Sequence, residues 1–163
     1  MSSKRILNVQ IQIDSSSYDI DLEEDLAFTE EEINKAYIEQ PVKFAWWATI
    51  AAQTKSTIDQ KKIEVERQED YLKKTLTAEL DIKVRRQLSE DGERITEAKV
   101  NSAVISHPEY RKAQLALYEL EDELLDLTKQ YNLIIAAKEA MIQRKDMLIS
   151  LGAQLRQKLN NED

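Results

Sequence analysis

The scarcity of helix-breaking residues constrains this chain more than any other feature. Its 163 residues include only two glycines and two prolines. Sandwiches, barrels and nucleotide-binding folds need many tight turns, and tight turns depend on glycine and proline. Residues 42–88 contain neither, which allows a continuous helix of about 70 Å. The sequence therefore predicts an all-α fold made of a few long helices.

The last third of the chain carries a regular coiled-coil pattern. From Ala113 to Leu159, mostly apolar residues recur at spacings of three and four, as in a helix that packs along another helix. A second apolar row, Ile135, Ile142 and Ile149, runs beside the first. Two rows on one helix indicate two packing partners. We expect one to be the first long helix, folded back as a hairpin, and the other to be a second copy of the chain.

The N-terminal part differs in composition and is expected to form an arm over residues 1–40. Residues 5–13 alternate apolar and polar side chains, which favours a single short strand or an extended segment. Residues 14–25 have the composition of a loop. Thr29 and Glu32 have the spacing of a capping box, so we expect a short helix there that ends before Pro41.

The remaining chain, residues 41–163, is predicted to form a hairpin of two long helices. Ser89 to Gly92 is the clearest break in its pattern, and a second break falls at His107-Pro108. Between these breaks we expect a short helix at about residues 94–105. His107 is interpreted as a residue that starts the last helix.

Residue usage argues against most kinds of catalytic or metal site. The chain has no cysteine and a single histidine, which excludes disulfides, thiolate zinc sites and a spare base for a Ser-His pair. Asp19, Asp21 and Glu23 alternate as in a calcium loop, but Glu24 stands where such a loop needs glycine. We therefore expect a protein that is not an enzyme and holds no metal or cofactor. The N-terminus is too polar for a signal peptide and no apolar run could span a membrane, so we expect a soluble intracellular protein.

The negative charge of the chain is unevenly distributed. The formal net charge is -8. Residues 1–40 hold ten acidic and three basic side chains, whereas residues 41–90 hold eight and ten. The arm could be simply solvated, could mimic nucleic acid, or could dock on a basic partner. The basic side chains that we consider as phosphate contacts are Lys55, Lys61, Lys62, Arg67, Lys73, Lys74, Lys83, Arg85 and Arg86.

These cations are interleaved with acids, so on a lone helix they would form a mixed, solvated face. In a homo-oligomer the same patch repeats, and weak copies add up to a phosphate-binding track. Trp46 and Trp47 favour a packed anchor at the helix start, with stacking on bases as the alternative. Lys138 and Lys145 lie on the apolar row, at a wet part of the seam or on the inner wall of a ring. The apolar layers predicted to form the oligomer interface are Leu120, Leu124, Leu127, Tyr131, Ile134, Met141 and Leu148.

Three segments resemble the UvsY-like recombination mediators of tailed phages. They are PVKFAWWATIAAQ at the head of the first long helix, AKVNSAVISHPEYRKA at the junction, and KDMLISLGA near the end. The resemblance extends over most of residues 37–158. It implies a ring-like homo-oligomer, hexameric or heptameric, that binds single-stranded DNA. It also implies that the protein acts in DNA recombination and repair in a phage-infected bacterial cell, by loading a RecA-type recombinase onto strands covered by single-strand binding protein.

The chain departs from the family in one functional element. A member from T-even phages has Leu-Lys-x-Arg near the end of its first long helix, and the nearest match here is Leu72-Lys73-Lys74, with Thr75 in place of arginine. Arg85 and Arg86 are the candidates to supply the missing charge. The alternative hypothesis is a purely structural coiled-coil oligomer, such as a phage tail or chaperone-like hairpin subunit, which explains the heptads but leaves the basic residues without a role.

Overall fold

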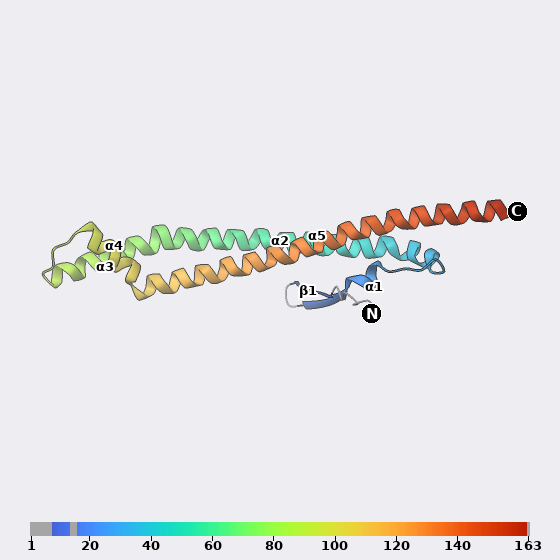
Figure 1. Ribbon diagram of the computed structural model, residues 1–163. Coiled ribbons are helices and arrows are strands. Elements are labelled where there is room, and N and C mark those ends of the chain that lie inside the picture. The colour runs from blue at the N-terminus through green and yellow to red at the C-terminus, as the bar shows by residue number, and fades with distance from the viewer. Residues whose placement is uncertain (1–7, 14–15, 163) are drawn as a thin grey trace. The chain divides into compact units, whose positions relative to one another are not determined.

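The computed structural model describes residues 8–13 and 16–162, and most of them are helical. The predicted long helices and the short helix between them are confirmed. In chain order the elements are β1 (Asn8–Ile13), β2 (Ser16–Asp21), α1 (Leu22–Leu26), α2 (Ile33–Asp70), the π-helical segment η1 (Tyr71–Leu76), α3 (Thr77–Glu90), α4 (Glu97–Ser106) and α5 (Pro108–Glu162) (Figure 1).

The predicted helix end before Pro41 is wrong, because α2 continues through this residue. Proline removes one amide donor and crowds the carbonyl four residues earlier, here that of Tyr37. Tertiary contacts with α5 offset this cost. The Tyr37 hydroxyl donates to the Leu148 carbonyl, and the Gln40 side chain donates to the Met141 carbonyl over 2.6 Å. The helix is therefore held by its neighbour where the local sequence would end it.

A π-helical segment explains a change of apolar spacing in the first long helix. Val65 and Leu72 are seven residues apart, but the next apolar positions, Leu76 and Leu80, follow at intervals of four. Hydrogen bonds in a π-helix span five residues, so its turns are wider than α-helical turns. Leu72 and Leu76 are both only 4% exposed. The wider turn thus keeps two residues with four-residue spacing on the buried side.

Local signals place the ends of α3, α4 and α5. Gly92 follows α3 with a φ of 68°, a left-handed conformation that suits glycine. The Thr96 hydroxyl caps α4 by accepting a hydrogen bond from the amide of Lys99. His107 precedes α5, and its Nδ1 accepts from the amide of Glu109 over 3.3 Å. The interpretation of His107 as a helix-start residue is confirmed.

The arm contains a β-hairpin, so the expectation of one unpaired strand followed by a loop is wrong. β1 pairs with β2 in antiparallel register, with Asn8 opposite Asp21 and Ile13 opposite Ser16. Residues 14 and 15, which connect the strands, lie outside the described residues. The composition of β2 disguised it, because two serines begin a strand whose pairing comes from β1.

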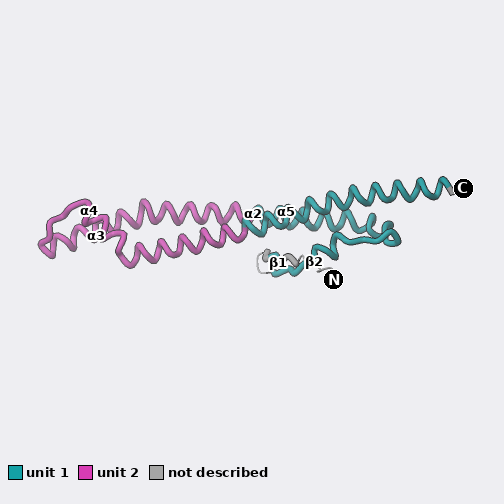
Figure 2. The backbone as a smooth tube through the Cα atoms, viewed as in Figure 1, with its two compact units in different colours: residues 1–56, 128–163 teal, residues 57–127 magenta. Residues whose placement is uncertain are grey.

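Two compact units divide the chain (Figure 2). Unit 1 combines residues up to Ser56 with those from Thr128 onward, and unit 2 is Thr57–Leu127. The division falls within α2 and α5 and does not coincide with the end of the arm. In each unit the first long helix and α5 run antiparallel. In unit 2, for example, Lys61 pairs with Glu123 and the later Gln68 with the earlier Ala113.

The core of unit 1 brings the arm onto α2 and α5. Trp47 is completely buried, and Ile11 of the arm is 1% exposed against it. Ile20, Leu22 and Leu26 of the arm pack around the same cluster. The members of this cluster are Ile11, Trp47, Ile50, Ala51, Ile134, Ala137 and Met141.

The core of unit 2 is aliphatic and joins α3, α4 and α5. Leu80 and Val100 are completely buried. The cluster comprises Leu72, Leu76, Leu80, Val84, Val100, Val104 and Leu117. The row with four-residue spacing turns gradually around the helix, which lets it meet α4 as well as α5. α4 therefore covers the part of the first long helix that the simple hairpin pattern left unexplained.

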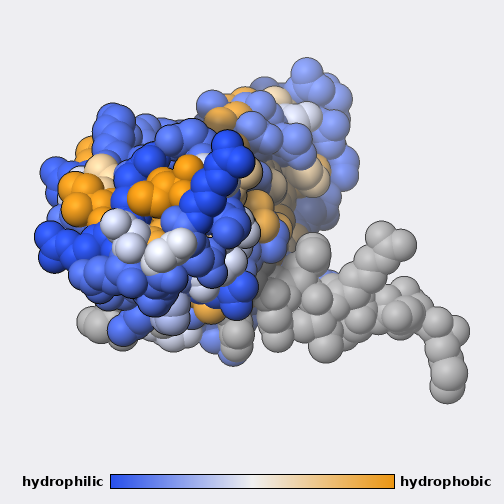
Figure 3. All heavy atoms as spheres, turned by 90° about the vertical axis from the view of Figure 1, so that its left-hand side faces the viewer, coloured by the Kyte–Doolittle hydropathy of each residue, from blue (hydrophilic) through white to orange (hydrophobic). Residues whose placement is uncertain are grey.

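Apolar side chains remain exposed at the end of unit 2. Figure 3 looks onto this end and shows hydrophobic patches between hydrophilic side chains. Ile82 of α3 is 64% exposed, Ile105 of α4 is 56% exposed, and Ile95 just before α4 is 42% exposed. Clustered apolar groups on a surface are typical of contact sites.

Among the described residues, no helix combines the length and hydrophobicity that crossing a bilayer requires.

Candidate nucleic-acid interface

The nine predicted phosphate contacts fall into groups with different surroundings. All lie on α2, η1 or α3. Some bridge to another helix, some pair with an acid on their own helix, and three have no acidic partner among the described residues. Lys55 is exposed and takes part in an interaction of its own. Because a phosphate must compete with any carboxylate already bound, these groups are not equivalent as DNA contacts.

Lys61 bridges α2 and α5. Its ammonium lies 2.8 Å from Glu123 of α5 and 2.9 Å from Glu64 of α2, and the side chain is only 21% exposed. The hydrogen bonds to Glu123 and then to Glu64 raise the pKa of Lys61 above its ordinary value. This lysine is charged and occupied, so the arrangement favours a structural role within unit 2.

Lys83 and Arg85 connect α3 to neighbouring helices. Lys83 lies 3.4 Å from Glu109 of α5. Arg85 bonds Asp81 on its own helix at 2.7 Å and makes two contacts with Glu97 of α4, at 2.7 and 2.9 Å. The hydrogen bonds to Asp81 and then Glu97 raise the pKa of Arg85. Both cations therefore stabilise the arrangement of helices in unit 2.

Lys73 and Lys74 lie on the π-helical segment η1 and point away from the core. Lys73 pairs with Glu69 at 3.1 Å and Lys74 with Asp70 at 2.8 Å. Both lysine side chains are well exposed, so these pairs are weak and easily exchanged for another anion. π-helical turns are frequent at functional sites. The segment that best matches the family element is thus also the irregular part of the helix.

Lys62, Arg67 and Arg86 are exposed and form no ion pair with any residue that the structure describes. Lys62 and Arg67 belong to α2, and Arg86 belongs to α3. A cation without a bound carboxylate has no ion pair to break when it contacts a phosphate. Pattern analysis could not separate these three from their neighbours, because the acids that neutralise the others come partly from α4 and α5.

The predicted oligomer positions divide into buried and half-buried groups. Ile134, Met141 and Leu148 are completely buried inside unit 1, where they pack against the chain's own arm and first long helix. The first apolar row of α5 is therefore the seam of the intramolecular hairpin. The half-buried positions are Leu120, Leu124, Leu127 and Tyr131.

The second apolar row of α5 stays open in part. Ile142 is 41% exposed and Ile149 is 51% exposed, whereas Ile135 packs against the core of unit 1. Ile142 and Ile149 line an apolar groove of about 340 Å³, whose other wall includes Pro41 and Phe44 of α2. Lys145, one of the two seam lysines, also lines this groove. The other, Lys138, lies 5.9 Å from the centre of the Phe44 ring.

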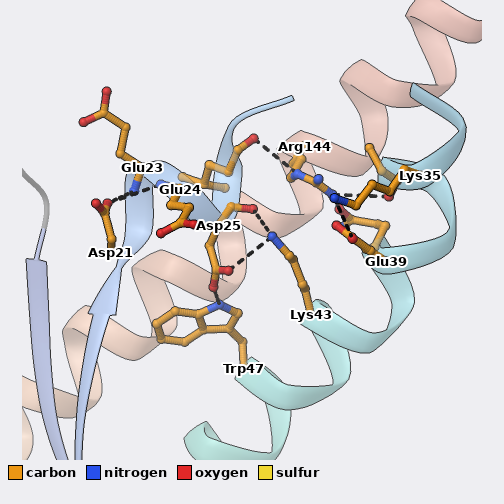
Figure 4. A network of polar contacts seen from close by, with 12 residues as sticks. Asp21, Glu23, Glu24, Asp25, Lys35, Glu39, Lys43, Trp47 and Arg144 are labelled. Carbon is orange, nitrogen blue, oxygen red and sulfur yellow. Dashed lines mark hydrogen bonds and ion pairs between the residues drawn. The ribbon is translucent and has the colours of Figure 1, made fainter. Parts of the chain in front are cut away.

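The two tryptophans anchor the arm. The indole N–H of Trp47 donates to Asp25 of the arm over 3.3 Å, and Lys43 pairs with the same carboxylate at 3.2 Å (Figure 4). Trp46 is half-buried and lies edge-on to the rings of Tyr18 and Trp47. The packed-anchor interpretation is confirmed for Trp47, whose complete burial leaves no face for a base. We call Asp25, Lys43 and Trp47 the arm clasp.

Sequence reasoning underrated one residue of this region. Arg144 is among none of the candidate residues of the sequence analysis, but it is only 3% exposed. Its spacing from Met141 and Leu148 places it next to the apolar row of α5, and this was the available signal.

Residues 8–13 and 16–162 contain no group of His, Asp or Glu side chains that could hold a metal ion. Comparison of the chain with protein-family models, curated proteins and solved structures gave no match.

Proposed function

We propose that this protein is a non-enzymatic recombination mediator of the UvsY-like type. In this proposal it binds single-stranded DNA as a ring-like homo-oligomer and loads a RecA-type recombinase onto strands covered by single-strand binding protein. The observation that carries the proposal is the order of parts: an acidic arm, a long helix headed by tryptophan, the AKVNSAVISHPEYRKA junction and a closing helix. PVKFAWWATIAAQ lies in α2, AKVNSAVISHPEYRKA runs from α4 into α5, and KDMLISLGA lies in α5.

Three surface cations are the strongest candidates for phosphate contacts. Lys62, Arg67 and Arg86 are exposed and have no acidic partner in the described part of the chain. Lys73 and Lys74 come next, because their partners are exposed acids on the same helix. Contacts to phosphate ignore base identity, which suits a protein that must act on any strand.

The open apolar row supports self-association. The groove beside Ile142 and Ile149 is lined mainly by apolar side chains of α2 and α5. Further exposed apolar residues of unit 1, Ile38 at 77% and Val42 at 71%, lie on α2. Repetition of three unpaired cations around an oligomer would give the multivalent phosphate track that one copy lacks.

The decisive experiment measures single-stranded DNA binding by fluorescence anisotropy across a range of salt. For the wild-type protein, the logarithm of the association constant should fall by about 0.7 per phosphate for each decade of salt. Changing Lys62, Arg67 and Arg86 together to alanine should weaken binding on every sequence alike. It should also make the slope shallower by about 2 for each subunit that the strand contacts, since three contacts per subunit are removed.

A matched control replaces Lys61, Lys83 and Arg85, whose carboxylate partners come partly from other helices. This triple variant removes the same charge and should leave the salt slope nearly unchanged, because its cations are already neutralised. If both triple variants bind like the wild type, the strand does not run along this helix. If the wild-type protein binds no DNA at low salt, the structural coiled-coil alternative replaces the proposal, and the paired cations then serve only to join helices.

A further inference from the structure

Arg144 is a buried positive charge without a charged partner among residues 8–13 and 16–162. Its Nε donates to the Leu26 carbonyl over 3.2 Å, and its Nη1 donates to Gln40 Oε1 and, over 3.5 Å, to the Ala36 carbonyl (Figure 4). All three acceptors are neutral. No described carboxylate lies within the 4.0 Å of an ion pair. A buried charge is costly unless an opposite charge or several dipoles compensate it.

The guanidinium is also only partly used as a donor. Phe28 covers it at 5.3 Å from the ring centre, a cation–π contact that offsets part of the desolvation cost. Its second terminal nitrogen, Nη2, donates to none of the described residues. Arginine carries five N–H donors, and Nε and Nη1 already use three of them. The two N–H groups of Nη2 therefore remain available for an anion.

Arg144 lines a cavity of about 490 Å³ within unit 1. This volume lies in the range of small-ligand sites. Ala27, Phe28 and Ala36 give the cavity apolar walls, and Lys35 adds a second cation. Lys43 also lines it but is held by Asp25 of the arm clasp. The cavity thus has apolar walls, an arginine with unused hydrogen-bond donors and an exposed lysine. Together these groups suit an oxyanion.

Three carboxylates of the lining, Glu24, Glu32 and Glu39, limit which anion can enter. With Lys43 held by Asp25, these carboxylates outnumber the two remaining cations, so a dianion such as phosphate meets about twice the net repulsion of a monoanion at the same distance. We propose that this cavity binds a carboxylate group, with Nη2 of Arg144 as its charged donor and Lys35 as the second cation. The site differs from the DNA-binding face proposed above and does not depend on it.

The test uses saturation-transfer NMR on the full chain, with propionate as the probe and inorganic phosphate as the competitor. Propionate should bind and phosphate should displace it poorly. Arg144→Gln should weaken propionate binding at least tenfold, because a charge-assisted hydrogen bond is lost. Lys145→Gln is the matched control, because Lys145 is next to Arg144 in the sequence, is exposed and lies outside the cavity. This variant should bind propionate as tightly as the wild-type protein.

A second pair of variants keeps the test decisive if Arg144→Gln fails to fold. Lys35 and Glu39 are both exposed and pair with each other at 3.7 Å. Lys35→Gln should weaken propionate binding about two- to fivefold, and Glu39→Gln should strengthen it by a similar factor. Unfolding cannot produce opposite effects from two neighbouring surface changes. Phosphate binding more tightly than propionate, or Lys35 and Glu39 variants that act in the same direction, would overturn the proposal.

The source of the carboxylate is distinguished by two further probes. A short peptide with a free C-terminus that binds at least tenfold tighter than propionate, and loses this gain as its C-terminal amide, identifies the end of a partner chain. Equal affinity of peptide and propionate identifies a small carboxylic acid. If neither the peptide nor propionate binds, the cavity is not a carboxylate site.

Discussion

Unit 1 and unit 2 use positive side chains in different ways. In unit 1, Arg144 lies in the interior on neutral carbonyl and amide groups, and Lys43 closes the arm clasp. In unit 2, Lys83 and Arg85 lie at the surface and join α3 to other helices through exposed carboxylates. The role of each cation therefore depends on how deeply its side chain is buried and on which groups it bonds, rather than on its position in a basic stretch.

This contrast separates structural charges from charges that can bind a ligand. Adjacent residues of the same charge have different environments: Arg144 is buried beside an exposed Lys145, and Lys61 is bridged beside an unpaired Lys62. Such neighbours provide matched pairs for experiments, because each member changes the charge of the chain equally.

The largest effect is expected from Arg144 and Lys145. Arg144→Gln removes the donor for two buried carbonyls and for Gln40, and should lower the free energy of unfolding by about 2–3 kcal/mol. Lys145→Gln removes an exposed ammonium whose contact with Asp146 is 3.6 Å long, and should change it by less than about 0.5 kcal/mol. Urea denaturation followed by circular dichroism measures both. Equal stabilities would mean that Arg144 does not hold the arm on α5.

The two glycines give the next comparison, one in each unit. A Cβ at Gly152 would lie 2.7 Å from the hydroxyl of Tyr37, whereas a Cβ at Gly92 would meet nothing within 4 Å. Gly152→Ala should therefore cost about 1–2 kcal/mol by crowding, despite the better helix propensity of alanine. Gly92→Ala should cost about 1–2 kcal/mol because of its positive φ.

Two rescue experiments distinguish these causes. Asparagine tolerates the left-handed conformation better than alanine, so Gly92→Asn should recover part of the stability. At Gly152 the recovery should come from Tyr37→Phe, which removes the crowded oxygen and makes the two changes non-additive. Thermal unfolding of the single and double variants measures the coupling. Additive effects at Gly152 and Tyr37 would refute the crowding explanation.

Lys61 and Lys62 should show opposite effects on stability and on DNA binding. Lys61→Met removes a bridge to Glu123 and should lower the free energy of unfolding by up to about 1 kcal/mol, since the pair is partly screened by solvent. Lys62→Met should leave stability unchanged and weaken single-stranded DNA binding. A Lys61 variant that loses DNA affinity while Lys62→Met retains it would reverse the assignment.

The smallest effect is a pH dependence of the Lys61 bridge. The carboxylate partners raise the pKa of Lys61 above its ordinary value of 10.5. The stabilisation is therefore complete below about pH 10.5 and is lost as the pH rises through the raised folded pKa. The stability difference between wild type and Lys61→Met should stay constant from about pH 7 to 9 and shrink above 10.5. A difference that disappears below pH 9 would contradict the raised pKa.

Periodicity predicted the helices, because each long helix repeats its apolar signal over many turns. It failed where a local signal was overridden. Pro41 was read as a helix end, but contacts of Tyr37 and Gln40 with α5 carry α2 through it. Sequence analysis missed the strand Ser16–Asp21, because its stability depends on pairing with β1 and on the packing of Ile20 against the core of unit 1.

The candidate DNA-binding residues were predicted as a set, but their roles could not be ranked. Glu123, Glu109 and Glu97 neutralise three of the lysines and arginines from helices that are distant in sequence. Spacing along α2 and α3 contains no information about these partners. The unpaired cations Lys62, Arg67 and Arg86 emerge only when the partners are known.

The sequence by itself determined the hairpin of two long helices, the position of the short helix between them and the start of the last helix at His107. These features depend on interactions within a few turns of the chain, which composition and spacing record directly. Tertiary structure alone decided that the arm packs on Trp47, that a π-helical turn adjusts the apolar row at Leu72, and that Arg144 is buried. Each of these depends on groups that meet across the hairpin, and the free energy of such a contact belongs to both partners rather than to either local sequence.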